Sequence, residues 1–261
     1  MNHAPASREP GEVALLTGPR AASVLAAALA PAGQRLESWE VHSVHHRPGA
    51  GVSVGYTAVV VSMSGRRSTE YLCATTARLS NPQAPGLTRV APTGGDGPPV
   101  YVWRHPADPE LPALPVACTP SLLSKRLGMP VKATMVAYRP TRRAVVRVTL
   151  PDSSTAYAKV LRPSQSAAFA HRHRMLAAAG VPAPEVLRED GDGLVLLSTG
   201  RGVALSGLLS RGMDDAQAKR VFSGLAGLLD SLPASAVDLP AHPAWSERAR
   251  HYAHAAATVL P

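Results

Sequence analysis

The stretch Tyr138-Arg-Pro-Thr-Arg-Arg-Ala-Val-Val-Arg-Val-Thr-Leu150, followed by Ser154-Thr-Ala-Tyr-Ala-Lys-Val-Leu-Arg162, determines how we interpret this chain. Apolar and polar residues alternate in both segments, as in strands that bury one face, and polar turns separate the runs. The pattern therefore predicts an antiparallel meander. Its three strands are expected at Val131–Arg139, Ala144–Leu150 and Thr155–Leu161.

The third strand contains Lys159, one of only four lysines among the 27 Lys and Arg residues. Tyr157, Ala158, Val160 and Leu161 flank it, so the base of its side chain should be buried. A buried ammonium group is costly unless an anion meets it, and phosphate oxygens could supply that anion. The alternative is a strand-edge lysine whose amine reaches water.

The turn between the first two strands contains Arg142 and Arg143 and no glycine. In nucleotide-binding sheets a loop at this place lies over the phosphates, and glycine is common there because backbone amides approach closely. Here the two arginines would offer charge instead. The alternative is a pair of solvated arginines at a hairpin tip.

Positive charge is concentrated in one part of the chain. The net charge is +9, and residues 121–180 hold 11 of the 27 basic residues with a single acid, Asp152. A local excess of this kind favours a local anionic partner such as a nucleotide or phosphate. Nucleic acid is not the expected partner, because a broad basic face with aromatic or recognition-helix elements is missing.

Several features predict a soluble, cytoplasmic protein without a membrane partner. The N-terminus lacks a signal-peptide pattern, and the alanine-rich run 21–32 is too short to span a bilayer. Cys73 and Cys118 are far apart and have no metal-ligand spacing, which fits a reducing compartment.

A similar sequence pattern, an internal repeat, precedes the quoted stretch. Two pairs of segments resemble each other. The first pair is His46-Arg-Pro-Gly-Ala-Gly-Val-Ser-Val-Gly-Tyr56 and Glu70-Tyr-Leu-Cys73, and the second pair is Tyr138–Arg147 and Ala156-Tyr-Ala-Lys159. Both copies have the order strand, Arg-Pro turn, strand, turn, strand, with Cys73 in the place of Lys159. The alternative is that two valine-rich meanders look alike by chance.

Residues 131–261 resemble the N-terminal half of the aminoglycoside phosphotransferase and maltokinase-like family. Residues 13–118, including Asp108-Pro-Glu-Leu-Pro112, resemble the cap domain of the maltokinase-like branch. Beyond the meander, the resemblance depends on these segments: Phe169, Met175-Leu-Ala-Ala-Ala-Gly-Val-Pro-Ala-Pro184, Gly193-Leu-Val-Leu-Leu197, Gly200-Arg-Gly202 and the helical stretch Trp245–Pro261.

The resemblance implies an α+β protein with a kinase-like, bilobal fold. It implies ATP and Mg²⁺ in the complete parent enzyme, a sugar-like or aminoglycoside-like hydroxyl acceptor, Lys159 as the phosphate lysine, and Leu197, Ser198 and Thr199 as the hinge at the adenine. The expected organisation is a disordered leader, a cap domain, a nucleotide-binding N-lobe and the start of an incomplete helical C-lobe. Their ranges are 1–12, 13–118, 119–202 and 203–261.

Two departures from the family pattern limit the function expected of this chain. No acid lies between Asp152 and Glu185, where the family has a glutamate that pairs with the lysine, and Phe169 and His171 fall near that place. No His-x-Asp sequence of the catalytic loop occurs, and no aspartate base or metal ligand follows His242-Pro243, so we expect no catalytic or metal-binding residues. We therefore expect the N-terminal portion of a phosphotransferase, inactive alone, or alternatively a non-catalytic nucleotide-binding or regulatory protein on the same scaffold.

Overall fold

The computed structural model describes residues 9–46, 49–91, 99–200, 202–241, 244, 246–250 and 252–253. Over these residues the protein is an α+β structure with two antiparallel five-stranded sheets and seven α-helices. The helices are α1 Glu9–Thr17, α2 Arg20–Leu29, α3 Leu114–Cys118, α4 Pro120–Leu127, α5 Pro163–Ala178, α6 Leu205–Arg211 and α7 Asp215–Asp230, with short 3-10 helices η1 Ala30–Ala32, η2 Ala234–Asp238 and η3 Ser246–Arg248.

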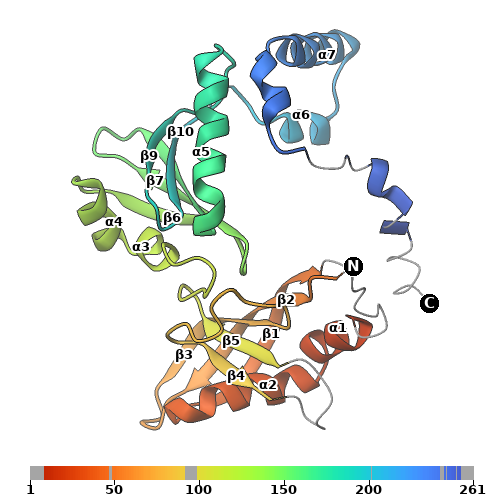
Figure 1. Ribbon diagram of the computed structural model, residues 1–261. Coiled ribbons are helices and arrows are strands. Elements are labelled where there is room, and N and C mark those ends of the chain that lie inside the picture. The colour runs from red at the N-terminus through yellow and green to blue at the C-terminus, as the bar shows by residue number, and fades with distance from the viewer. Residues whose placement is uncertain are drawn as a thin grey trace.

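The first sheet has the order β1-β2-β3-β5-β4, and helices α1 and α2 pack on it (Figure 1). Its strands are β1 Arg35–His46, β2 Val52–Val61, β3 Arg67–Thr75, β4 Thr88–Val90 and β5 Val100–Arg104. Leu16, Leu25 and Tyr56 are fully buried between helices and sheet, and the Tyr56 hydroxyl donates to the carbonyl of Leu16 at 2.6 Å. Residues 9–12, which the sequence placed in a disordered leader, form the first turn of α1.

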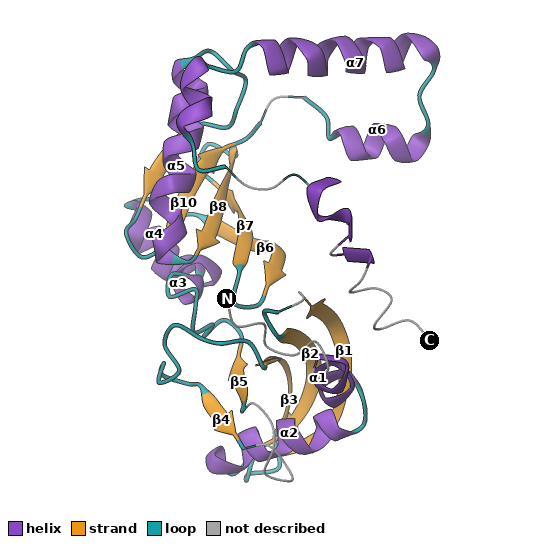
Figure 2. Cartoon of the chain, turned by 45° about the vertical axis from the view of Figure 1, so that its right-hand side comes forward, coloured by secondary structure: helices purple, strands orange, loops and turns teal. Residues whose placement is uncertain are grey.

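The second sheet has the order β6-β7-β8-β10-β9 and is covered on both faces (Figure 2). Its strands are β6 Lys132–Arg139, β7 Arg143–Thr149, β8 Thr155–Leu161, β9 Val186–Glu189 and β10 Leu194–Ser198. On one face, Leu114 of α3 and Leu123 of α4 pack against Val146 and Val160. On the other face, α5 packs its Ala170 against Val195 and Leu197.

The two sheets have the same strand order, which agrees with the internal repeat in the sequence. Cys73 lies two residues before the end of β3, and Lys159 lies two residues before the end of β8. Helix α5 sits between β8 and β9, whereas residues 76–87 between β3 and β4 contain only turns and bends. The environment of Lys159 is therefore built by an element that the first sheet lacks.

Helices α6 and α7 lie beside each other and project from the second sheet (Figures 1 and 2). The sequence predicted an amphipathic helix over Asp214–Leu232, and α7 begins there with a capping box between Asp214 and Gln217. No residue of α7 is buried, and Phe222 and Leu229 on its apolar side are largely exposed. Most of the helix expected over Trp245–Leu260 lies outside the described residues.

No single helix among the described residues is long and apolar enough to cross a membrane. One bent helix pair, Pro10–Thr17 with Arg20–Ala32, meets the length and composition requirements when taken together. In α2 of this pair, Ala21, Val24, Leu25 and Leu29 are buried. These residues belong to the core of the first sheet.

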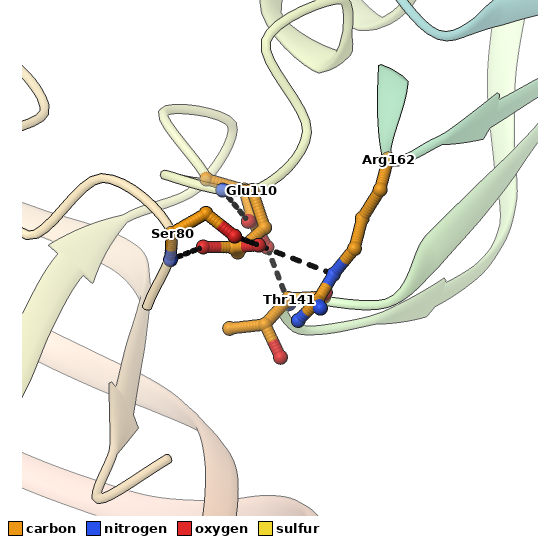
Figure 3. Close-up of polar contacts among 5 residues, drawn as sticks. Ser80, Glu110, Thr141 and Arg162 are labelled. Atoms are coloured by element: carbon orange, nitrogen blue, oxygen red, sulfur yellow. Dashed lines mark hydrogen bonds and ion pairs between the residues drawn. The ribbon is translucent and has the colours of Figure 1, made fainter. Parts of the chain in front are cut away.

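Two buried carboxylates join the sheets (Figure 3). The Glu110 carboxylate accepts from the backbone N–H and the hydroxyl of Ser80, and it lies 3.2 Å from Nε of Arg162. The Arg162 Nε also donates to the carbonyl of Thr141 at 2.8 Å. Glu110 thus connects the loop after β3 to the segment between β8 and α5.

Asp108 holds the turn between β6 and β7. Its carboxylate accepts from the backbone N–H of Thr141 and the hydroxyl of Tyr138, both at 2.7 Å, and from the backbone N–H of Glu110 at 2.9 Å. Trp103 of the first sheet donates to the Tyr138 hydroxyl at 3.2 Å. Burial raises the pKa of Asp108 above its ordinary value, although these three hydrogen bonds act in the opposite direction.

Replacing Glu110 by Gln should destabilise the protein, because it removes the charge that meets Arg162 and one acceptor of the Ser80 contacts. We expect a loss of roughly 1.5–3 kcal/mol in the free energy of unfolding, the range for hydrogen bonds to charged groups. Glu185→Gln, at an exposed position, is the matched control. Urea unfolding measures both variants, and equal stability of the two would contradict the role given to Glu110.

Candidate anion-binding site

Lys159 lies in the middle of the second sheet, on the face that α5 covers. It pairs with Val145 of β7 on one side and with Val195 of β10 on the other. The side chains of β8 alternate, so Ala158 and Val160 enter the core while Lys159 is half-buried on the opposite face. This half-buried position agrees with the expectation that the base of the side chain is buried.

The group next to the Lys159 ammonium is an aromatic ring. Its Nζ lies 4.2 Å from the centroid of the Phe169 ring on α5, a cation–π distance. Among the described residues, Lys159 forms no ion pair with a carboxylate. Phe169 thus lies where the family resemblance led us to expect an acidic partner of Lys159.

A cavity of about 500 Å³, called here the Lys159 cavity, opens beside this pair. None of the described residues that line it carries a carboxylate, and its volume falls within the roughly 300–1,000 Å³ of small-molecule sites. The lining residues that matter for binding are Lys159, Arg139, Arg142, Arg143, Arg172 and Phe169.

The Lys159 cavity is lined by basic side chains without acidic ones among the described residues. Burial lowers the pKa of the Lys159 ammonium below its ordinary value of 10.5, and the positive charges of Arg143 and Arg172 lower it further. A bound polyanion would reverse both effects, because it would replace lost solvation and screen the guanidinium groups from the lysine. The arrangement is therefore suited to binding phosphate or another multiply charged anion.

The turn between β6 and β7 borders the cavity in a fixed shape. Thr141 has a positive φ of 61°, which is uncommon for a residue other than glycine. The Asp108 carboxylate and the Arg162 side chain hold its backbone N–H and carbonyl. The turn therefore needs no glycine. Arg139 and Arg143 flank it and lie directly opposite each other in the hairpin.

The structure brings together three of the six residues that the sequence singled out. Lys159, Arg142 and Arg143 line the Lys159 cavity, whereas the expected hinge residues are not among its lining residues. Leu197 is buried, Ser198 forms two hydrogen bonds with Glu185, and the exposed Thr199 donates to the carbonyl of Thr155.

Sequence reasoning missed Arg139 and Arg172. Arg139 could have been found from the predicted hairpin, because it faces Arg143 once the turn is placed. Arg172 follows Phe169 by three positions, a spacing that puts both on one face of a helix. Without the packing of α5 on the sheet, nothing in the sequence indicated which face that is.

Replacing Phe169 by Glu should raise the pKa of Lys159, because an opposite charge beside an ammonium favours its charged form. Isotope-labelled reductive methylation of the four lysines, with Lys159→Arg to assign the signal, measures this by NMR titration. The Lys159 signal should titrate below 10.5 in the unsubstituted protein and higher in Phe169→Glu. Phe169→Gln is the neutral control, and the same titration in the Glu and Gln variants would contradict the proposed geometry.

Comparison of the chain with protein-family models, curated proteins and solved structures finds no match. The functional inference therefore rests on the geometry and charge of the Lys159 cavity.

Proposed function

We propose that the chain carries the nucleotide-binding lobe of an ATP-dependent small-molecule phosphotransferase with a kinase-like fold. The Lys159 cavity receives the phosphates. The observation that carries this proposal is the half-buried side chain of Lys159, which pairs with no carboxylate of the described residues, in a cavity that four arginines also line. A triphosphate matches this charge and satisfies donors that are otherwise costly to desolvate.

The order of elements supports the proposal. Protein kinases cover the ATP phosphates with a hairpin loop, carry the phosphate lysine on the third strand and place a helix next to it. The β6–β7 turn, Lys159 on β8 and the following helix α5 stand in the same order in the second sheet. In this proposal helices α6 and α7 belong to a helical lobe, and the acceptor is a hydroxyl of a sugar-like or aminoglycoside-like molecule.

The residues of the cavity do not fit a Mg²⁺ ion. Magnesium prefers oxygen ligands, usually with one or two carboxylates, and the described lining residues include none. No group of three or more His, Cys, Asp or Glu side chains that could hold a metal occurs among the described residues. Together with the missing His-x-Asp sequence, this assigns binding, and not phosphoryl transfer, to the residues present.

The second candidate function is a non-catalytic nucleotide-binding or regulatory protein on the same scaffold. Phe169 favours it, because this ring replaces the acid that orients the lysine in active kinases. Magnesium distinguishes the two candidates, since phosphotransferases use the metal–nucleotide complex. Tighter binding of ATP with Mg²⁺ than without it favours the transferase lobe, and tighter binding of free ATP favours the non-catalytic protein.

The compartment that we propose is the cytoplasm. Cys73 and Cys118 are both free thiols, and Cys73 is buried. Burial raises the pKa of the Cys118 thiol to about 11, so this thiol is not activated as a nucleophile. Both cysteines fit a reducing environment.

ATP titration by calorimetry tests the site. Lys159→Ala should weaken ATP binding about tenfold, which corresponds to the loss of roughly 1.4 kcal/mol of charge-assisted hydrogen bonding. Lys219→Ala, which removes an exposed lysine on α7, is the control and should leave the affinity unchanged. Equal ATP affinity of the Lys159→Ala variant and the unsubstituted protein would overturn the role given to Lys159.

A further inference from the structure

A second, smaller cavity lies between the two sheets. It has a volume of about 200 Å³ and is bordered by the end of the β1–β2 hairpin, the segment after β3 and the β6–β7 turn. We call it the junction cavity. Its lining residues relevant here are His45, Arg78, Arg139, Thr141, Arg142 and Arg162.

The lining of the junction cavity is rich in basic side chains. Four arginines and one histidine line it, and none of its described lining residues is a carboxylate. Glu110, the nearest acid shown to contact one of these arginines, is already engaged with Ser80 and with Nε of Arg162. Arg162 is therefore compensated by Glu110, whereas no ion pair among the described residues involves Arg78 or Arg139.

Two buried nitrogen atoms of the lining residues lack a hydrogen-bond partner. Nε2 of His45 and Nε of Arg139 are both buried, and neither contacts an acceptor within the part of the chain that the structure describes. A buried donor or acceptor that is left unsatisfied costs about 1–3 kcal/mol, so two such atoms in one cavity call for a ligand or another partner. Burial and the charge of Arg139 lower the pKa of His45, in agreement with an environment that already holds too much positive charge.

The wall of the cavity is held in place before any ligand arrives. Thr141 is buried, and its strained backbone is fixed by Asp108 and Arg162. Arg162 itself is anchored by Glu110 at 3.2 Å. Fixed arginines bind an oxyanion with less loss of side-chain entropy than mobile ones.

The geometry points to a second oxyanion site in the junction cavity, which takes a single phosphate group, either as inorganic phosphate or as the monoester of a small metabolite. Arginine side chains bind phosphate in a bidentate manner, and four of them line this cavity. The volume is below the roughly 300–1,000 Å³ of pockets for larger ligands, so the site accommodates a phosphate group and not a nucleotide.

This site shares a wall with the Lys159 cavity, because Arg139 and Arg142 line both. His45 and Arg78 line only the junction cavity, and Lys159 and Arg172 line only the larger one. Each site can therefore be altered by substituting a residue that does not line the other site. A phosphate bound at the junction would position Arg139 at the edge of the Lys159 cavity.

Calorimetric titration of the full chain with inorganic phosphate, in buffer free of phosphate and sulfate, tests the proposal. We expect a Kd of about 1 mM or tighter. Arg78→Gln and His45→Gln should each weaken phosphate binding about tenfold, whereas Lys159→Gln should change it less than about twofold. Arg78 is exposed, so its substitution leaves folding intact even if His45→Gln does not, and thermal unfolding of both variants checks this.

The outcomes separate this site from the ATP site. Loss of phosphate binding in Arg78→Gln with unchanged ATP binding supports the junction site, whatever Lys159→Ala does to ATP. Phosphate binding that disappears in Lys159→Gln and persists in Arg78→Gln would assign phosphate to the larger cavity and overturn the proposal, as would no binding at all. A parallel titration with glycerol phosphate distinguishes the monoester from the free ion, and tighter binding of either one identifies the preferred source.

Discussion

The ion pair between Glu110 and Arg162, with the hydrogen bonds of Asp108 beside it, is the interaction on which the rest of the structure depends. Both carboxylates come from one proline-rich segment between the sheets and are almost completely buried. Asp108 accepts from the backbone N–H of Thr141, and Arg162, which Glu110 anchors, donates to the Thr141 carbonyl. Glu110 also ties the loop at Ser80 to the second sheet. The β6–β7 turn, which carries Arg139, Arg142 and Arg143, is thereby fixed relative to the first sheet.

The same segment explains why positive charge is left over nearby. Asp108 and Glu110 are used inside the junction, where they stabilise the turn, and they do not face the cavity beside Lys159. On α5 the position next to the lysine holds Phe169, whose ring covers the ammonium without neutralising it. Two cavities lined by arginines therefore border one rigid turn, and we propose a phosphate group as the ligand of both.

Much of the fold could be predicted from the sequence. The meander of the second sheet follows the alternation of apolar residues closely, because β7 and β8 bury every second side chain in the core. Strands β4 and β9 and helix α3 were not predicted. They are short, and proline or loop-like neighbours surround them, so tertiary packing and not local pattern determines them.

The site was predicted in part, and the reason is physical. Lys159 could be singled out because lysine is rare in this chain and apolar residues flank it. The contribution of Arg139 follows from the register of the predicted hairpin, whereas that of Arg172 depends on the packing of α5, which a single sequence does not specify. The roles of Asp108 and Glu110 depend on contacts with residues about thirty positions away, and their segment gave no local signal beyond a family resemblance.

The most direct test of the central claim is a crystal structure of the protein with a non-hydrolysable ATP analogue. The account predicts that the phosphates occupy the Lys159 cavity, with phosphate oxygens at about 2.7–3.2 Å from Nζ of Lys159 and from the guanidinium of Arg142 or Arg143. An analogue bound elsewhere, with Lys159 still covered only by Phe169, would contradict it.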